Sequence, residues 1–139
     1  MRRAMILVAV LATMMVIPVT AGAETTADDY VGTWTSVDID GSNQTLTIRK
    51  VGVRFQMTLL DDGGSFCGEF AGPGPTENPT VALIARGIGT IQMDGTLRVR
   101  SYHIVCDNRV VGPSIPVTYT LLTETTMVDD TGVTGWVKT

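Results

Sequence analysis

The sequence predicts an all-β fold, an eight-stranded antiparallel up-and-down barrel. After Asp29 nearly every segment alternates apolar and polar residues, glycine-containing turn signals recur at intervals that suit strands, and no segment has the periodicity of an amphipathic helix. Sequential hairpins favour closure, because a closed barrel leaves no hydrogen-bonding edge open. A two-sheet β-sandwich is the alternative, since the two long loops could be crossovers between sheets.

The first 23 residues have the features of a cleaved signal peptide. Arg2 and Arg3 precede a continuous apolar run, and the small residues Ala21 and Ala23 fit the cleavage pattern. The run is shorter than the ~20 residues that span a bilayer, and it contains no cysteine for a lipid anchor. We therefore expect a single domain over residues 24–139, secreted or periplasmic, with no stable membrane anchor.

Four strands are expected in the first half, each an alternating run followed by a turn or loop: Val31–Asp38, Thr45–Val51, Val53–Asp61 and Ser65–Phe70. Asp40-Gly41 and Gly52 form the first two turns. The segment from Ala71 to Pro79 holds three prolines and two glycines, so it is expected to be a long loop.

Four more strands are expected in the second half: Val81–Met93, Thr96–Cys106, Val117–Thr123 and a final strand after the Asp129–Gly132 turn. Asp94-Gly95 forms a tight turn, and Asp107–Pro116 is a second long loop. In the strand before that loop, alternation places five residues on one inward face: Leu97, Val99, Ser101, His103 and Val105.

Cysteine use and charge narrow the range of partners. Cys67 and Cys106 are the only cysteines, and an oxidising compartment favours a disulfide between them. The chain has 10 Lys and Arg against 14 Asp and Glu, and two of the ten lie in the leader. The basic residues are scattered along the sequence, so nucleic acid is not an expected partner.

The acidic residues and the single histidine do not predict a metal site. One histidine and a bridged cysteine pair cannot make a zinc site. Asp38-Ile39-Asp40 resembles the start of a calcium loop, but Arg49 stands where the bidentate Glu belongs. The pairs Asp61-Asp62 and Asp129-Asp130 are expected to be solvated turn carboxylates. We expect no metal and no cofactor.

Two glycines on one strand, Gly87 and Gly89, remove side-chain volume from the barrel wall. Either the strand bends there or the interior has room. If there is room, eight residues would line a mostly apolar cavity: Phe55, Met57, Leu83, Val99, Ser101, His103, Val117 and Tyr119. The alternative is that these same side chains fill the barrel. His103 is expected to be a polar group of this interior, and no catalytic residue or enzymatic activity is predicted.

The first strand carries a family resemblance. Val31-Gly32-Thr33-Trp34 resembles the Gly-x-Trp signature of lipocalins and other calycins, including avidin-like barrels, and the chain also looks like small exported bacterial β domains. The resemblance implies that Trp34 plugs the closed end of the barrel and that a basic residue of the last strand, here Lys138, packs over it. The family normally places an arginine there.

These observations predict a binding protein of unknown ligand. The first hypothesis is noncovalent binding of a small apolar molecule in the barrel. The alternative is an envelope or secreted inhibitor-like protein that binds another extracytoplasmic protein through the loops Ala71–Pro79 and Asn108–Pro116. A filled barrel would favour the alternative.

Overall fold

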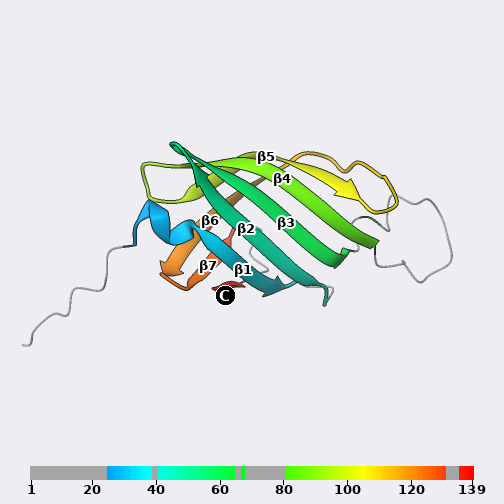
Figure 1. The fold of residues 1–139 in the computed structure, drawn as a ribbon, viewed down its shortest axis with the longest axis horizontal. Helices are drawn as coiled ribbons and strands as arrows, with labels where there is room; N and C mark the ends of the chain where they lie inside the picture. Colours follow the sequence, from blue (N-terminus) through cyan, green and yellow to red (C-terminus); the bar gives the residue numbers. More distant parts are fainter. Residues whose placement is uncertain (1–24, 39–40, 65–66, 68–80, 131–134) are drawn as a thin grey trace, which may run out of the picture.

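The computed structural model describes residues 25–38, 41–64, 67, 81–130 and 135–139, and the expected signal peptide lies outside them. The described chain forms a closed antiparallel barrel in which each strand pairs with the next and the last strand pairs with the first (Figure 1). The predicted eight-stranded up-and-down barrel is confirmed, and the β-sandwich alternative is wrong. No helix in the described ranges is long and apolar enough to span a membrane.

One turn of 3-10 helix, η1, precedes the barrel: Ala27–Tyr30. The strands are β1 (Gly32–Val37), β2 (Asn43–Val51), β3 (Arg54–Gly64), β4 (Val81–Ile91), β5 (Leu97–Cys106), β6 (Ile115–Thr123), β7 (Thr126–Asp129) and β8 (Gly135–Lys138).

The segments that form the eight strands differ from the predicted ones at two places. Apart from Cys67, the strand expected at Ser65–Phe70 lies outside the described residues. β7 was not predicted from the sequence, because the turn before it contains neither glycine nor proline. Threonine hydroxyls stabilise that turn instead, with Thr123 Oγ1 2.7 Å from Thr126 Oγ1 and accepting a hydrogen bond from the Thr125 amide.

One end of the barrel, which we call the closed end, is sealed by η1 and the start of β1. The Trp34 side chain has no exposed surface, and its indole N–H donates to the Tyr30 carbonyl at 2.8 Å. The Lys138 ammonium lies 5.2 Å from the Trp34 ring centroid and donates to the Asp29 carbonyl. Trp34 and Lys138 therefore lie in the arrangement that the Gly-x-Trp resemblance implied for them.

A β-bulge in β5 corrects the predicted inward face of that strand. The register passes from Arg86↔His103 to Gly89↔Val99, so β5 has one residue more than β4 over this stretch. Arg100 and Ser101 are consecutive exposed residues, and Tyr102 takes the next buried position. The prediction that Ser101 and His103 face the interior is therefore wrong, because the bulge reverses the alternation after Val99.

The interior beside the two glycines is filled by neighbouring side chains. A Cβ on Gly87 would lie 2.5 Å from Val99 Cγ1, and a Cβ on Gly89 would lie 2.8 Å from Leu97 Cδ1. Val99 and Leu97 themselves have no exposed surface, so no water-sized space borders them. Here the glycines make room for core side chains and leave none for a ligand.

Candidate functional site

The end opposite the closed end is the candidate site, and we call it the rim. It comprises the described residues at which β1, β3, β5 and β7 end and β2, β4, β6 and β8 begin. The rim carries the only disulfide of the chain and the longest connection that the structure describes between two strands, residues 107–114.

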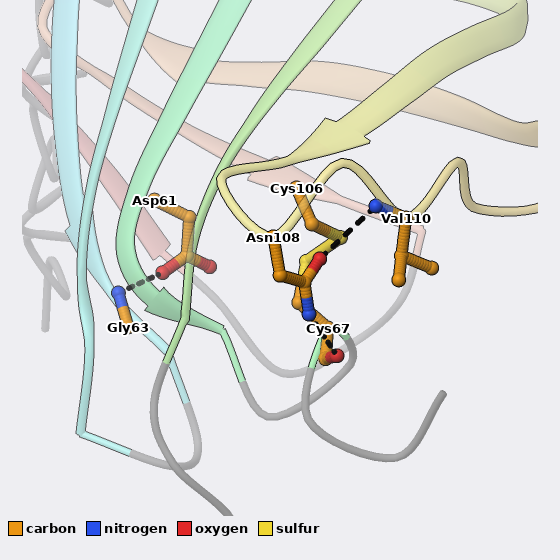
Figure 2. The surroundings of a disulfide bond; sticks show 6 residues. All are labelled: Asp61, Gly63, Cys67, Cys106, Asn108 and Val110. Atoms are coloured by element: carbon orange, nitrogen blue, oxygen red, sulfur yellow. Dashed lines mark hydrogen bonds between the residues drawn. A yellow bond between two sulfur atoms is a disulfide. The ribbon is translucent and has the colours of Figure 1, made fainter. Parts of the chain in front are cut away.

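The predicted disulfide is present between Cys67 and Cys106, with 5.8 Å between the Cα atoms (Figure 2). Cys106 is the last residue of β5, and Cys67 follows the end of β3. Both cysteines are buried. A buried disulfide is consistent with an extracytoplasmic location, where oxidising conditions maintain it.

The side chain of Asn108 connects the disulfide to the loop that follows it. Its amide nitrogen donates to the Cys67 carbonyl at 3.3 Å, and its oxygen accepts from the Val110 amide at 3.1 Å (Figure 2). Between these contacts, Arg109 adopts a left-handed backbone conformation at φ 67° and its side chain is exposed. The loop tip therefore presents an arginine from a fixed backbone.

Backbone hydrogen bonds tie the rest of this loop to the barrel. The Asp107 amide donates to the Ala82 carbonyl at 2.9 Å, and the Gly112 amide donates to the Ile104 carbonyl at 3.1 Å. The Val111 backbone also forms a β-bridge with Val105, while its side chain is 61% exposed. The loop is thus held at both ends and in the middle.

Two buried carboxylates brace the inner side of the rim. Asp61 accepts a hydrogen bond from the Gly63 backbone amide at 3.0 Å (Figure 2). It accepts another from the Gln44 side-chain amide, also at 3.0 Å. Asp129 accepts a hydrogen bond from the Trp136 indole at 2.9 Å. The expectation that both aspartates are solvated turn carboxylates is therefore wrong, and both have a structural role.

Of the three buried tyrosines, Tyr102 and Tyr119 lie next to each other in the core. The hydroxyls of Tyr102 and Tyr119 are 3.0 Å apart, and the Tyr119 ring meets Trp136 edge to face, with the centroids 6.2 Å apart. Burial raises the pKa of both hydroxyls, and the negative charge of Asp129 raises the two pKa values further.

These raised pKa values predict that the barrel loses stability in alkali. Above about pH 10 an unfolded tyrosine ionises while its buried counterpart keeps its proton, so the free energy of unfolding falls by up to about 1.4 kcal/mol per pH unit for each tyrosine. Below about pH 10 tyrosine is protonated in both states, so the buried tyrosines contribute their full stabilisation there. Denaturant titrations between about pH 8 and 12 measure this slope, and Tyr102→Phe should make it shallower. An unchanged slope in Tyr102→Phe would mean that Tyr102 ionises normally in the folded protein.

The eight candidate lining residues divide into two groups. Six of them are buried core residues: Phe55, Met57, Leu83, Val99, Val117 and Tyr119. The other two, Ser101 and His103, lie on the outer wall. There the Ser101 hydroxyl shares a hydrogen bond with the Ser114 hydroxyl, and His103 pairs in register with Arg86. The structure does not bring Ser101 and His103 together with the six core residues.

Sequence analysis missed the arginines of the outer wall. Arg54, Arg86 and Arg100 come from three different strands, yet together they line one surface groove. Only the pairing of the strands brings them together.

No group of three or more metal-ligating side chains occurs in the described part of the chain. The closed antiparallel barrel is compatible with a calycin-like fold. Comparisons with protein-family models, with curated proteins and with solved structures found no match for this chain.

Proposed function

We propose that the protein is an exported, inhibitor-like binding protein that engages another extracytoplasmic protein through its rim. One observation carries this proposal: the loop 107–112 is fixed by a disulfide and by hydrogen bonds, and it exposes Arg109 and Val111. A loop that is already ordered loses little conformational entropy on binding, so more of the contact energy appears as affinity. Arginine is also enriched among the residues that dominate binding energy at protein interfaces.

Binding of a small apolar molecule inside the barrel stays a prediction. The packing around Gly87 and Gly89 supports the protein-binding alternative over it, because core side chains occupy the space that these two glycines leave. We also propose kinship with the calycin group, supported by the Trp34 plug and by Lys138 packed over it. No catalytic role is proposed for His103.

Site-specific crosslinking tests the rim. A photoreactive amino acid at Val111 should yield one discrete protein adduct in the extracytoplasmic fraction of the source organism, and excess unmodified protein should compete it away. The matched control is Met93, which is fully exposed in the β4–β5 turn at the closed end. Identical adducts from both positions would contradict the proposal. So would no adduct from Val111 together with a small molecule that native mass spectrometry releases on denaturation.

Arg109→Gly tests the role of the Arg109 side chain without changing the fold of the loop. Glycine adopts a positive φ without strain, so this variant should keep the loop conformation while removing the guanidinium group. If Arg109 is a main contact, affinity for the crosslinked partner should fall at least about tenfold, or about 1.4 kcal/mol. Unchanged affinity with an intact fold would exclude Arg109 as the anchor.

A further inference from the structure

The outer wall formed by β2 to β5 gathers arginines that lie far apart in the sequence. These four strands run side by side along one wall of the barrel (Figure 1). Five exposed arginines project from this wall: Arg49, Arg54, Arg86, Arg98 and Arg100. The fold thus gives an acidic chain one basic face, which we call the arginine face.

Three of these arginines surround a groove of about 560 Å³, formed by Arg54, Arg86 and Arg100 with Ile88, Thr90 and Ser101. The groove lies where the register between β4 and β5 is interrupted, between Arg86↔His103 and Gly89↔Val99. The β5 bulge places Arg100 and Ser101 next to each other on the surface. A charged side chain and a hydroxyl therefore border the same concave site.

No carboxylate neutralises the arginine face within the described residues. The single ion pair found there joins Lys50 to Asp28 at the closed end, and none of the five guanidinium groups has a hydrogen-bond partner in that part of the chain. On the outward positions of β3 to β5 the only acidic residue is Asp62, which accepts hydrogen bonds from Asn43 near the rim. Arginines grouped without counter-charges repel one another, and a bound anion would relieve that repulsion.

The lining of the groove indicates the class of anion. Guanidinium groups bind tetrahedral oxyanions through paired, charge-assisted hydrogen bonds. The Thr90 hydroxyl is a further donor. The Ser101 hydroxyl can donate to an anion when Ser114 is the donor of the hydrogen bond between these two serines. Among the described residues no aromatic side chain lines the groove, so they offer no stacking surface of the kind that bases need. Ile88 is the only exposed large apolar side chain that the described residues contribute to the groove, and a concave site of this kind suits a discrete anionic group better than a flat bilayer.

We propose that the arginine face binds an extracytoplasmic phosphate-bearing polymer. One phosphate group lies in the groove between Arg54, Arg86 and Arg100, and neighbouring groups along the chain contact Arg49 or Arg98. This site is on the wall of the barrel and does not depend on the protein-binding rim. The basic residues are scattered along the sequence, but the pairing of β2 to β5 brings five arginines together on one surface.

Binding of a short inorganic polyphosphate to the purified, disulfide-bonded protein tests this proposal. Calorimetry at several salt concentrations should give an affinity that falls as salt rises. The double variant Arg86→Gln/Arg100→Gln should weaken binding at least about tenfold and reduce the slope of log affinity against log salt by roughly 0.7 for each lost contact. Arg86→Lys/Arg100→Lys keeps the charge but loses the paired geometry, so its affinity should lie between the two.

Lys50→Gln is the control matched to the single variant Arg86→Gln, because each removes one positive charge and Lys50 lies at the closed end, where it is already paired with Asp28. It should leave polyphosphate binding within about twofold. If this control lost as much affinity for polyphosphate, the net charge of the protein would explain the loss, and the proposed site would be wrong. No binding to polyphosphate, equal binding to polyglutamate, tighter binding to duplex DNA, or binding to anionic phospholipid vesicles alone would each overturn the proposal. Circular dichroism of each variant confirms that the barrel is folded.

Discussion

Replacing Trp34 with alanine should lower the free energy of unfolding by about 3–5 kcal/mol, the cost typical of removing a buried aromatic side chain. The side chain is fully buried, so its removal leaves a cavity at the closed end. It also removes the hydrogen bond to the Tyr30 carbonyl and the surface on which Lys138 packs. Urea denaturation of the oxidised protein measures the change.

Two milder variants separate these contributions. Trp34→Phe keeps most of the apolar volume but loses the indole N–H, so it should cost less than Trp34→Ala. Lys138→Met removes the cation above the ring and should cost only about 0.5–1 kcal/mol from that contact. If Trp34→Ala proved no more destabilising than Lys138→Met, the tryptophan would not be the plug that the family resemblance implies.

Removing the disulfide through Cys67→Ser and Cys106→Ser together should cost about 4 kcal/mol. The bridge joins residues 39 positions apart, and the chain-entropy model assigns roughly this value to a loop of that length. Chemical reduction of the unmodified protein should give a similar loss, which checks that the serines themselves do no harm. Thermal and urea unfolding measure both.

The same double variant should affect the rim far more than the closed end. Asn108 bonds to the Cys67 carbonyl, so loss of the bridge frees the loop that follows Cys106. Hydrogen exchange should become faster at the amides of Val110 and Gly112, while the Trp34 amide stays protected. Unchanged protection of Val110 would show that the backbone bonds of the loop hold it without the disulfide.

Local sequence signals predicted most of the barrel. Asp94-Gly95 marks a tight turn because Gly95 adopts a positive φ of 82° that other residues avoid, and alternation placed Phe55 and Met57 inside. The same signals failed at β7, where hydroxyl hydrogen bonds replace the glycine. They failed again in β5, because alternation assumes that no residue is inserted into a strand.

The candidate sites were harder to predict because they depend on pairing across the barrel. A hydrogen bond from Gln44 on the neighbouring strand compensates the burial of Asp61. The residues next to Asp61 in the sequence do not predict this partner. The disulfide was predictable, because only two cysteines exist. The fixed positions of Asn108 and Arg109 beside the disulfide were not predictable, because they depend on contacts between chain segments far apart in the sequence.

The pairing of β1 with β8 determines when folding can be completed. The Thr35 hydroxyl and the Val137 carbonyl, which meet across this seam, belong to residues 102 positions apart. A chain that emerges with its N-terminus first, from a ribosome or from a membrane pore, can therefore build seven strands and still carry two open hydrogen-bonding edges. Until Gly135–Lys138 has emerged, those edges can pair with other chains. The yield of folded protein should therefore depend on how long this state lasts and on whether chaperones bind it.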